Sequence, residues 1–415
     1  MAIKEFFEIP KRYRTWSLAL MGVGVLAVVL GYFVYGTGDA HHKTRFWASL
    51  MHNSIFFLLI ANASMFFICA TTLAWGGWQM SFRRVPEAIS TAVLPLGVIA
   101  LVVLLGVAWG GHEMTHIYHW TDEAAVNADP ILKGKSPFLN LKFFTIWTLA
   151  TVALWWFLGY RMRQLSRSID NNPLEDGEAS RKYIWKNTVN AALFIVWFAL
   201  TIMSTVPWLW LMSIDAHWYS TMYSWYTFAS SWVAGIALMA LFVVYLKNKG
   251  YLEYTNEEHL HDIGKFMFAF SVFWTYLWFS QYMLIWYANI PEETTYFNSR
   301  IVTNHSTGAY SFIFWLQFII NFLAPLLILM RRGSKRNFTT VTIMAAVIIF
   351  GHWLDFYQMI FASVSPEHVE LGWLDFGVAA GFVGVIMYVT GTSLAKYPLI
   401  AKNHPFVKES IIHHT

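Results

Sequence analysis

The sequence predicts an all-α polytopic membrane protein, and three observations lead to this prediction. Of the 415 residues, 57% are hydrophobic and only 13% are charged, whereas soluble domains carry about a quarter charged residues. A helix needs about 20 mainly apolar residues to cross the hydrocarbon core, and about ten stretches meet that requirement. The single cysteine, Cys69, excludes an intrachain disulfide and a thiolate cluster.

These stretches form one integral membrane domain over residues 1–415. The expected spans lie near 15–35, 47–75, 88–110, 141–161, 187–212, 223–246, 264–289, 308–330, 338–361 and 372–394. The charged N-terminus is followed by an apolar run long enough to stay in the bilayer, so we expect no cleaved signal peptide. Because the number of spans is even, both termini share one side of the membrane.

Basic residues decide which side that is. Of the 28 Lys and Arg residues, 22 fall on the termini and on the loops that share their side, and six fall on the opposite loops. Loops rich in Lys and Arg stay in the cytoplasm, so we expect both termini to be cytoplasmic. The net charge of +4 then reflects topology, and it gives no reason to infer nucleic-acid binding.

Ionisable residues collect near the outer ends of the expected spans and at one point inside them. Residues of this kind are costly in a membrane and are therefore functional candidates. The set comprises His52, His112, Glu113, His116, His119, Asp215, His217, Glu292, Glu293, His305, His352 and Asp355.

Two of these residues, Asp215 and His217, lie in the outer turn SIDAHWYSTMYSWY, residues 213–226. Interfacial anchoring of aromatic residues explains Trp218 and Tyr219, but it does not explain the acid and the imidazole. An ordinary solvent-exposed loop could hold both Asp215 and His217. Alternatively, the two side chains could supply a base and a hydrogen-bond acceptor beside an aromatic-walled slot.

His352 and Asp355, in GHWLDFYQ, are three residues apart and therefore share one helical face. An imidazole beside a carboxylate can accept and pass on a proton. A hydrogen-bonded pair that only locks the helix to its neighbours is an equal alternative.

Other chemistries fit the sequence less well. HEMTH, residues 112–116, matches the zinc-protease pattern, but it sits where an apolar run ends and no third ligand stands out. Intramembrane histidines are too scattered for the usual two-haem bundle, and C-x-x-C-H is absent. A secondary transporter remains an alternative, although no convincing internal repeat supports it.

Three stretches carry a resemblance to a known family. LMSIDAHWYSTMYSWYTFASSW (211–232), FWTYLWFSQYMLIWYANIPEETTYF (273–297) and GHWLDFYQMI (351–360) resemble a membrane subunit of bacterial alternative complex III. This complex is a quinol:cytochrome c, or quinol:oxidase, oxidoreductase. The subunit in question is the second of its two polysulfide-reductase-like (NrfD-like) membrane subunits, and the resemblance runs over most of the chain.

The resemblance implies two four-helix bundles plus a flanking helix pair, in the bacterial inner membrane. It implies as partners a sister NrfD-like subunit, an iron–sulfur subunit, c-type haem subunits and, in some complexes, a terminal oxidase. It implies no redox metal in this chain and no catalysis by the chain alone. The role could be quinone binding (menaquinone or ubiquinone type), proton conduction, or a purely structural scaffold.

Two groups of candidate residues follow. The quinone-binding candidates are His52, His112, Glu113, His116, Asp215, His217, Trp218 and Tyr219. The proton-path candidates are Gln281, Glu292, Glu293, His305, His352 and Asp355.

Overall fold

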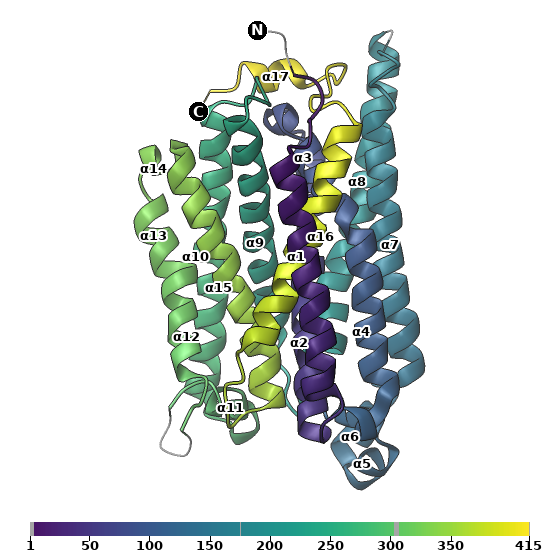
Figure 1. Cartoon of the computed structure of the whole chain (residues 1–415), viewed down its shortest axis with the longest axis vertical. Coiled ribbons are helices and arrows are strands. Elements are labelled where there is room, and N and C mark those ends of the chain that lie inside the picture. Colours follow the sequence, from purple (N-terminus) through teal and green to yellow (C-terminus); the bar gives the residue numbers. More distant parts are fainter. Residues whose placement is uncertain (1–3, 175, 303–306, 415) are drawn as a thin grey trace.

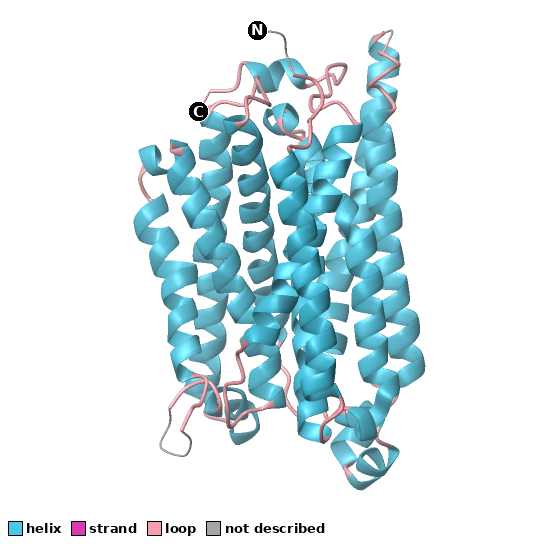
Figure 2. Cartoon of the chain, in the orientation of Figure 1, coloured by secondary structure: helices cyan, strands magenta, loops and turns pink. Residues whose placement is uncertain are grey.

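The computed structural model describes residues 4–174, 176–302 and 307–414. Within these ranges the chain folds into helices and loops, without strands (Figure 2). The long helices are α1 (Lys11–Gly31), α2 (Ala40–Leu73), α4 (Val93–Met114), α7 (Leu141–Arg167), α8 (Gly177–Met203), α9 (Thr221–Asn248), α10 (Glu257–Ala288), α15 (Phe338–Val364) and α16 (Trp373–Lys396).

Shorter elements complete the chain. The short α-helices are α3 (Arg84–Ile89), α5 (Glu123–Ala128), α6 (Pro130–Lys135), α11 (Pro291–Asn298), α12 (Ser311–Phe318), α13 (Ala324–Leu329), α14 (Arg332–Arg336) and α17 (Val407–Ile411). The π-helical segments are η1 (Tyr32–Gly36), η5 (Thr205–Leu211) and η7 (Ile319–Leu323), and the 3-10 segments are η2 (Trp78–Ser81), η3 (Ser90–Ala92), η4 (His119–Thr121) and η6 (Met212–Asp215).

Among the described residues, nine helices are long and apolar enough to cross a membrane, as in a multi-pass membrane protein. One of them is the continuous run of α12, η7 and α13. One of the ten expected stretches, 264–289, corresponds to α10, a helix of 32 residues that is not among the nine. The physical reason is composition, because Trp, Tyr, Ser and Gln within α10 lower its mean hydropathy.

The long helices run side by side, and both termini lie at one end of the bundle together with α14 and α17 (Figure 1). The opposite end carries α5, α6 and α11. The main helix contacts join α1 to α16, α2 to α4, α8 and α9, α7 to α8, and α9 to α10 and α15. We call the end that carries α5, α6 and α11 the loop end, and the other end the terminal end.

Side-chain caps fix where several helices begin. Asp39 accepts a hydrogen bond from the backbone of His42 at the start of α2, and Asn337 does the same for Thr340 at the start of α15. Such caps satisfy backbone N–H groups that the first turn leaves unpaired. The cap at Asp39 starts α2 seven residues before the expected span at 47, so His52 lies well inside the helix.

Candidate functional site

A cluster of polar side chains lies inside the bundle where α9, α10 and α15 meet. This central cluster consists of Tyr226 and Ser230 on α9, Trp274 on α10, and His352 and Asp355 on α15, and each of them is at most 3% exposed. Tyr226 and Ser230 are four residues apart, and His352 and Asp355 are three apart. The helical period therefore turns both pairs toward the same interface.

Asp355 is the acceptor at the centre of the cluster. The Ser230 hydroxyl donates to its Oδ2 at 2.8 Å, and the Trp274 indole N–H donates to the same oxygen at 2.9 Å. The Tyr226 hydroxyl donates to Oδ1. Buried polar groups are stable only when their hydrogen bonds are satisfied, and three donors meet this requirement for Asp355.

His352 reaches Asp355 through Ser230. Its Nδ1 lies 3.0 Å from the Ser230 hydroxyl oxygen and 3.8 Å from Asp355 Oδ2. Because the Ser230 proton is donated to Asp355, the hydrogen-bond network assigns a proton to His352 Nδ1. Nε2 is then the unprotonated nitrogen, and it has no hydrogen-bond partner among the described residues. The expected His352–Asp355 pair is thus a relay with a hydroxyl in the middle.

Unsatisfied polar atoms continue from the cluster toward the terminal end. Asn321 lies in the π-helical η7, and a side chain at Gly351 would touch its Oδ1, so Asn321 packs directly against α15 beside His352. Both amide atoms of Asn321 and the hydroxyl of Ser271 are buried without a partner in the described parts of the chain. Buried water molecules commonly bridge polar groups of this kind. π-Helical segments frequently occur at functional sites.

Aromatic rings connect the cluster to the loop end. The Tyr223 ring lies 6.1 Å from those of Tyr226 and Tyr296, and Arg300 lies over Tyr296 with 3.6 Å from Cζ to the ring centroid. Burial raises the pKa of Tyr296, and the charge of Arg300 opposes that shift. Arg300 is 2% exposed and donates to the carbonyl oxygens of Tyr296 and Gln358.

A cavity of about 970 Å³ opens at this point. Its lining includes Tyr296 and Arg300 together with Asp215, Glu367 and His368. The cavity therefore places titratable groups at the loop end of the aromatic rings. We call it the polar cavity.

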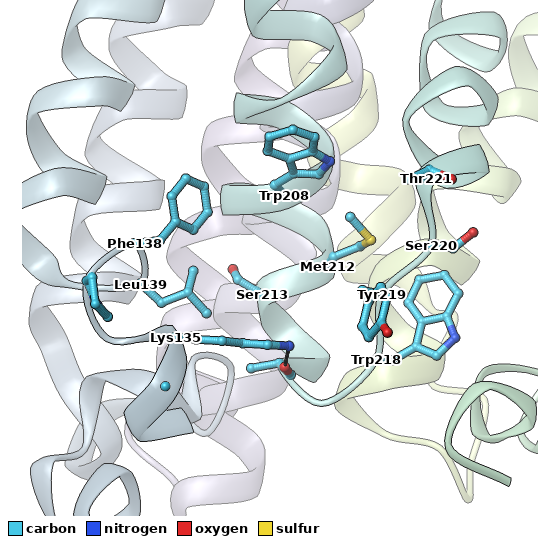
Figure 3. A pocket seen from close by; sticks show the side chains of 13 residues that line it. Lys135, Phe138, Leu139, Trp208, Met212, Ser213, Trp218, Tyr219, Ser220 and Thr221 are labelled. Atoms are coloured by element: carbon cyan, nitrogen blue, oxygen red, sulfur yellow. Dashed lines mark hydrogen bonds between the residues drawn. The ribbon is translucent and has the colours of Figure 1, made fainter. Parts of the chain in front are cut away.

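A second cavity, of about 450 Å³, lies under the outer turn (Figure 3). Its walls are mainly aromatic and apolar, with Phe138, Trp208, Trp218 and Tyr219 around it. Lys135 reaches into it and donates to the carbonyl oxygen of Ala216 at 2.5 Å. Figure 3 shows Phe138 and Trp208 on one side and Trp218 and Tyr219 on the other. We call it the aromatic cavity.

Asp215 and His217, which were expected to act as a pair, contact different parts of the structure. His217 Nε2 contacts the carboxylate of Asp129, and its side chain is 55% exposed. That hydrogen bond is the largest cause that lowers the pKa of Asp129. Asp215 lines the polar cavity. Burial lowers the pKa of Lys135, whereas the charges of Asp215 and Asp129 oppose that shift.

His52 lies apart from both cavities. It is fully buried, its Nε2 lies 2.9 Å from the carbonyl oxygen of Trp353, and its Nδ1 lacks a partner within the described ranges. The Trp353 indole donates to Asn53 at 2.9 Å. His52 thus links α2 to α15 at Trp353, the residue that follows His352.

The remaining sequence candidates are scattered. Gln281 is buried on α10 with its Nε2 unpartnered among described atoms. Glu292 and Glu293 lie in the first turn of α11, where the carbonyl oxygen of Glu293 accepts from Trp218. His305 lies outside the described residues.

The HEMTH stretch does not form one regular helix. Gly111 has a non-helical φ of 63°, and α4 ends at Met114, so helical spacing does not place His112 and His116 on one face. The backbone N–H of His116 donates to Thr44 at 3.0 Å. The side chains of His112 and Glu113 lie outside the described residues.

Several residues of this site were not among the sequence candidates, including Tyr226, Ser230, Trp274, Arg300 and Asn321. Tyr226 closes the outer turn of residues 213–226, where the aromatic belt accounted for it. The four-residue spacing from Tyr226 to Ser230 was a usable signal, because it matches the face of a helix.

No protein-family model matches the chain, and no curated protein matches it at the significance required.

Proposed function

We propose that this chain is a proton-conducting membrane subunit of a bacterial quinol-oxidising complex of the alternative complex III type. In this proposal it lies in the inner membrane with both termini in the cytoplasm. It assembles with a sister NrfD-like subunit, an iron–sulfur subunit and c-type haem subunits. The central cluster carries the proposal, because it places a carboxylate, a hydroxyl and an imidazole in one hydrogen-bonded line inside the bundle.

The hydrogen-bond directions among His352, Ser230 and Asp355 indicate the direction of proton transfer. His352 Nε2 accepts a proton from water near Asn321 and Ser271, while Nδ1 passes its proton to the Ser230 oxygen. Ser230 hands its own proton to Asp355. The Tyr226 hydroxyl also donates to Asp355, so a proton that has reached the carboxylate moves on toward the polar cavity after this hydroxyl turns to accept it and releases its own proton. Imidazole suits this role because it can be protonated on one nitrogen and deprotonated on the other.

The helix contacts support the proposed family arrangement. α2, α4, α7 and α8 contact one another in sequence, and α9, α10, α15 and the α12–α13 run do the same, while α1 packs against α16. This pattern fits two four-helix bundles with a flanking pair. The resemblance to the second NrfD-like subunit supplies the partners, and the basic residues of the terminal end support its cytoplasmic side.

The first experiment tests the complex. A C-terminal tag is used for gentle extraction from native membranes, followed by a haem spectrum and a quinol-oxidation assay. Stoichiometric c-type haem with quinol oxidation supports the proposal. A lone, colourless and inactive chain contradicts it and favours a secondary transporter.

The second experiment tests proton conduction. The purified complex is reconstituted in liposomes, and protons released per electron are measured for Asp355→Asn and Tyr226→Phe. Both variants should lower the proton yield more than the rate of quinol oxidation. Tyr118→Phe is the matched control, because Tyr118 is equally buried and donates to the carbonyl of Trp210 in the other half. An unchanged proton yield would leave a structural scaffold as the role.

A second role, quinone binding, is favoured by the aromatic cavity. Ligand pockets of this kind combine apolar walls with a few polar groups. Here the rings of Phe138, Trp208 and Trp218 can enclose a quinone ring, and Lys135 and Tyr219 can donate to its carbonyl oxygens.

Quinone retention tests this second role. Leu139→Trp would fill the aromatic cavity, whereas Ile131→Trp places the same bulk on the nearby α6 at a half-exposed position outside the lining. Quinone extracted from the purified protein should fall only for Leu139→Trp. Equal quinone content in both variants would exclude binding at this cavity.

A further inference from the structure

A third cavity, of about 460 Å³, lies between the α1–α16 pair and helices α2, α9 and α15. Rings and aliphatic chains form its lining, which includes Phe57, Phe242 and Phe350. Phe350 is 42% exposed and Phe376 is 48% exposed, so the cavity is a groove that opens on the lipid-facing side. We call it the α1–α16 groove.

The length of the groove matches one membrane leaflet. Along α16 the lining extends from Phe376 to Met387, which at about 1.5 Å per residue is roughly 16 Å. This is about half of a hydrocarbon core that is about 30 Å thick. The terminal end of the groove is at Tyr13, on the first turn of α1. An acyl chain that enters from the leaflet at the terminal end would therefore fill it.

Two ammonium groups lie at this mouth of the groove. Tyr13 and Tyr245, which both line it, have ring centroids 5.6 Å apart, and the Phe7 ring joins them to Tyr251. Lys249 Nζ lies 6.0 Å from the Tyr245 ring, and Lys4 Nζ lies 5.2 Å from the Tyr251 ring. Both lysines are exposed.

Two nearby charged groups have other contacts. Lys247 donates to the carbonyl oxygens of Leu252 and Glu253, and Glu5 pairs with Lys402 at 2.5 Å. The mouth therefore combines an apolar slot with the ammonium groups of Lys4 and Lys249. Lysines at a membrane surface attract anionic lipid headgroups.

We propose that the α1–α16 groove is a binding site for one anionic phospholipid. One acyl chain lies in the groove against Phe57, Phe242 and Phe350, and the phosphate lies at the mouth near Lys4 and Lys249. The lipid comes from the leaflet at the terminal end. It fills the gap between the α1–α16 pair and the rest of the bundle, so it stabilises that contact.

Native mass spectrometry of the purified protein, in whatever assembly it is isolated, tests the headgroup. After delipidation, phosphatidylglycerol or phosphatidylcholine is added back and bound lipid is counted. Phosphatidylglycerol should bind more tightly. The double variant Lys4→Gln, Lys249→Gln should weaken its binding by about thirtyfold. Each lysine near an anionic surface contributes about 1 kcal/mol, and every 1.4 kcal/mol changes the affinity tenfold. The matched control is Arg181→Gln, Lys182→Gln, two exposed cations on α8.

A second variant tests the acyl-chain slot. Ala346 lines the groove at an exposed position on α15, so Ala346→Trp should displace the retained lipid without a clash in the core. Ile343→Trp, on the same helix at a 57% exposed position outside the lining, should retain it. Equal affinity for the two lipids, binding unaffected by the lysine pair, or an isoprenoid quinone as the molecule that Ala346→Trp displaces would each overturn the proposal.

Discussion

The hydroxyl of Ser230 on α9 lies 2.8 Å from Oδ2 of Asp355 on α15, although the two residues are 125 positions apart in the chain. The same hydroxyl oxygen lies 3.0 Å from His352 Nδ1. One small side chain therefore completes the connection between an imidazole and a carboxylate that are too far apart to bond directly. If the central cluster conducts protons, Ser230 is the link that can be removed with least change in volume.

Ser230→Ala should interrupt the relay while keeping the fold. The loss of a hydrogen bond to a carboxylate should cost about 1.5–3 kcal/mol of stability, and proton release per electron should fall in the reconstituted complex. Ser231→Ala is the matched control, because the Ser231 hydroxyl donates to the carbonyl of Phe228 in the same helix. A proton yield that is the same in both variants would show that Ser230 is a structural residue.

Arg45 and Asp375 form a buried ion pair between α2 and α16. Arg45 Nη1 donates to Asp375 Oδ1 at 3.2 Å, its Nη2 contacts Oδ2, and Nη2 also donates to the carbonyl of Glu370 at 2.5 Å. Asp375→Asn removes the fully buried one of the two carboxylates that pair with Arg45, and the other, Glu370, keeps its Oε2 3.4 Å from Arg45 Nε. We therefore expect a loss of up to about 3–5 kcal/mol. Thermal unfolding in detergent measures the loss.

The exposed pair of Glu5 and Lys402 is the control for this measurement. Both side chains are about half exposed, and surface ion pairs contribute about 0–1 kcal/mol, so Glu5→Gln should change stability little. Equal losses for Asp375→Asn and Glu5→Gln would contradict the view that Arg45 depends on Asp375.

Most of the fold could be predicted from the sequence because long apolar runs are a strong local signal. The run at 338–361 corresponds to α15 (Phe338–Val364), and the run at 223–246 to α9 (Thr221–Asn248). Positions set by capping and by tertiary contacts were harder to predict. The expected spans leave Arg45 in an outer loop, whereas the Asp39 cap extends α2 to include it and Asp375 neutralises it.

The site could be predicted only in part, because its geometry depends on which helices become neighbours. The three-residue spacing of His352 and Asp355 indicated a shared helical face, and both residues are in the central cluster. Ser230 comes from another helix, and a single sequence does not reveal that contact. Asp215 and His217 are close in sequence, but the turn after η6 directs His217 to Asp129 and leaves Asp215 at the polar cavity.

Gly24 and Gly381 allow α1 and α16 to pack at very short range. A Cβ atom at Gly24 would lie 2.3 Å from the Gly381 Cα, and small residues at such crossings let membrane helices approach closely. Gly24→Val should therefore separate the helices and cost at least about 1–3 kcal/mol, the usual cost of overpacking. Gly22→Val is the control, since a Cβ there meets nothing within 4 Å. Thermal unfolding of both variants measures the difference, and similar melting temperatures would contradict close packing at Gly24.

His404 makes the attachment of the C-terminal segment sensitive to acid. It is 7% exposed, its Nδ1 accepts from the N–H of Phe406, and burial together with the charge of Arg83 lowers its pKa to about 3. Its usual pKa is about 6.5. The folded state therefore binds fewer protons than the unfolded state between these values, so stability is fully present above pH 6.5 and is lost as the pH falls toward 3. The slope should reach at most about 1.4 kcal/mol per pH unit.

Proteolysis of the segment after Lys396 should accelerate below pH 6.5 in the parent protein. His404→Phe should remove most of this pH dependence, whereas His42→Phe, at an exposed histidine in the first turn of α2, should preserve it. If the parent and His404→Phe show the same pH profile, acid release is controlled by another group.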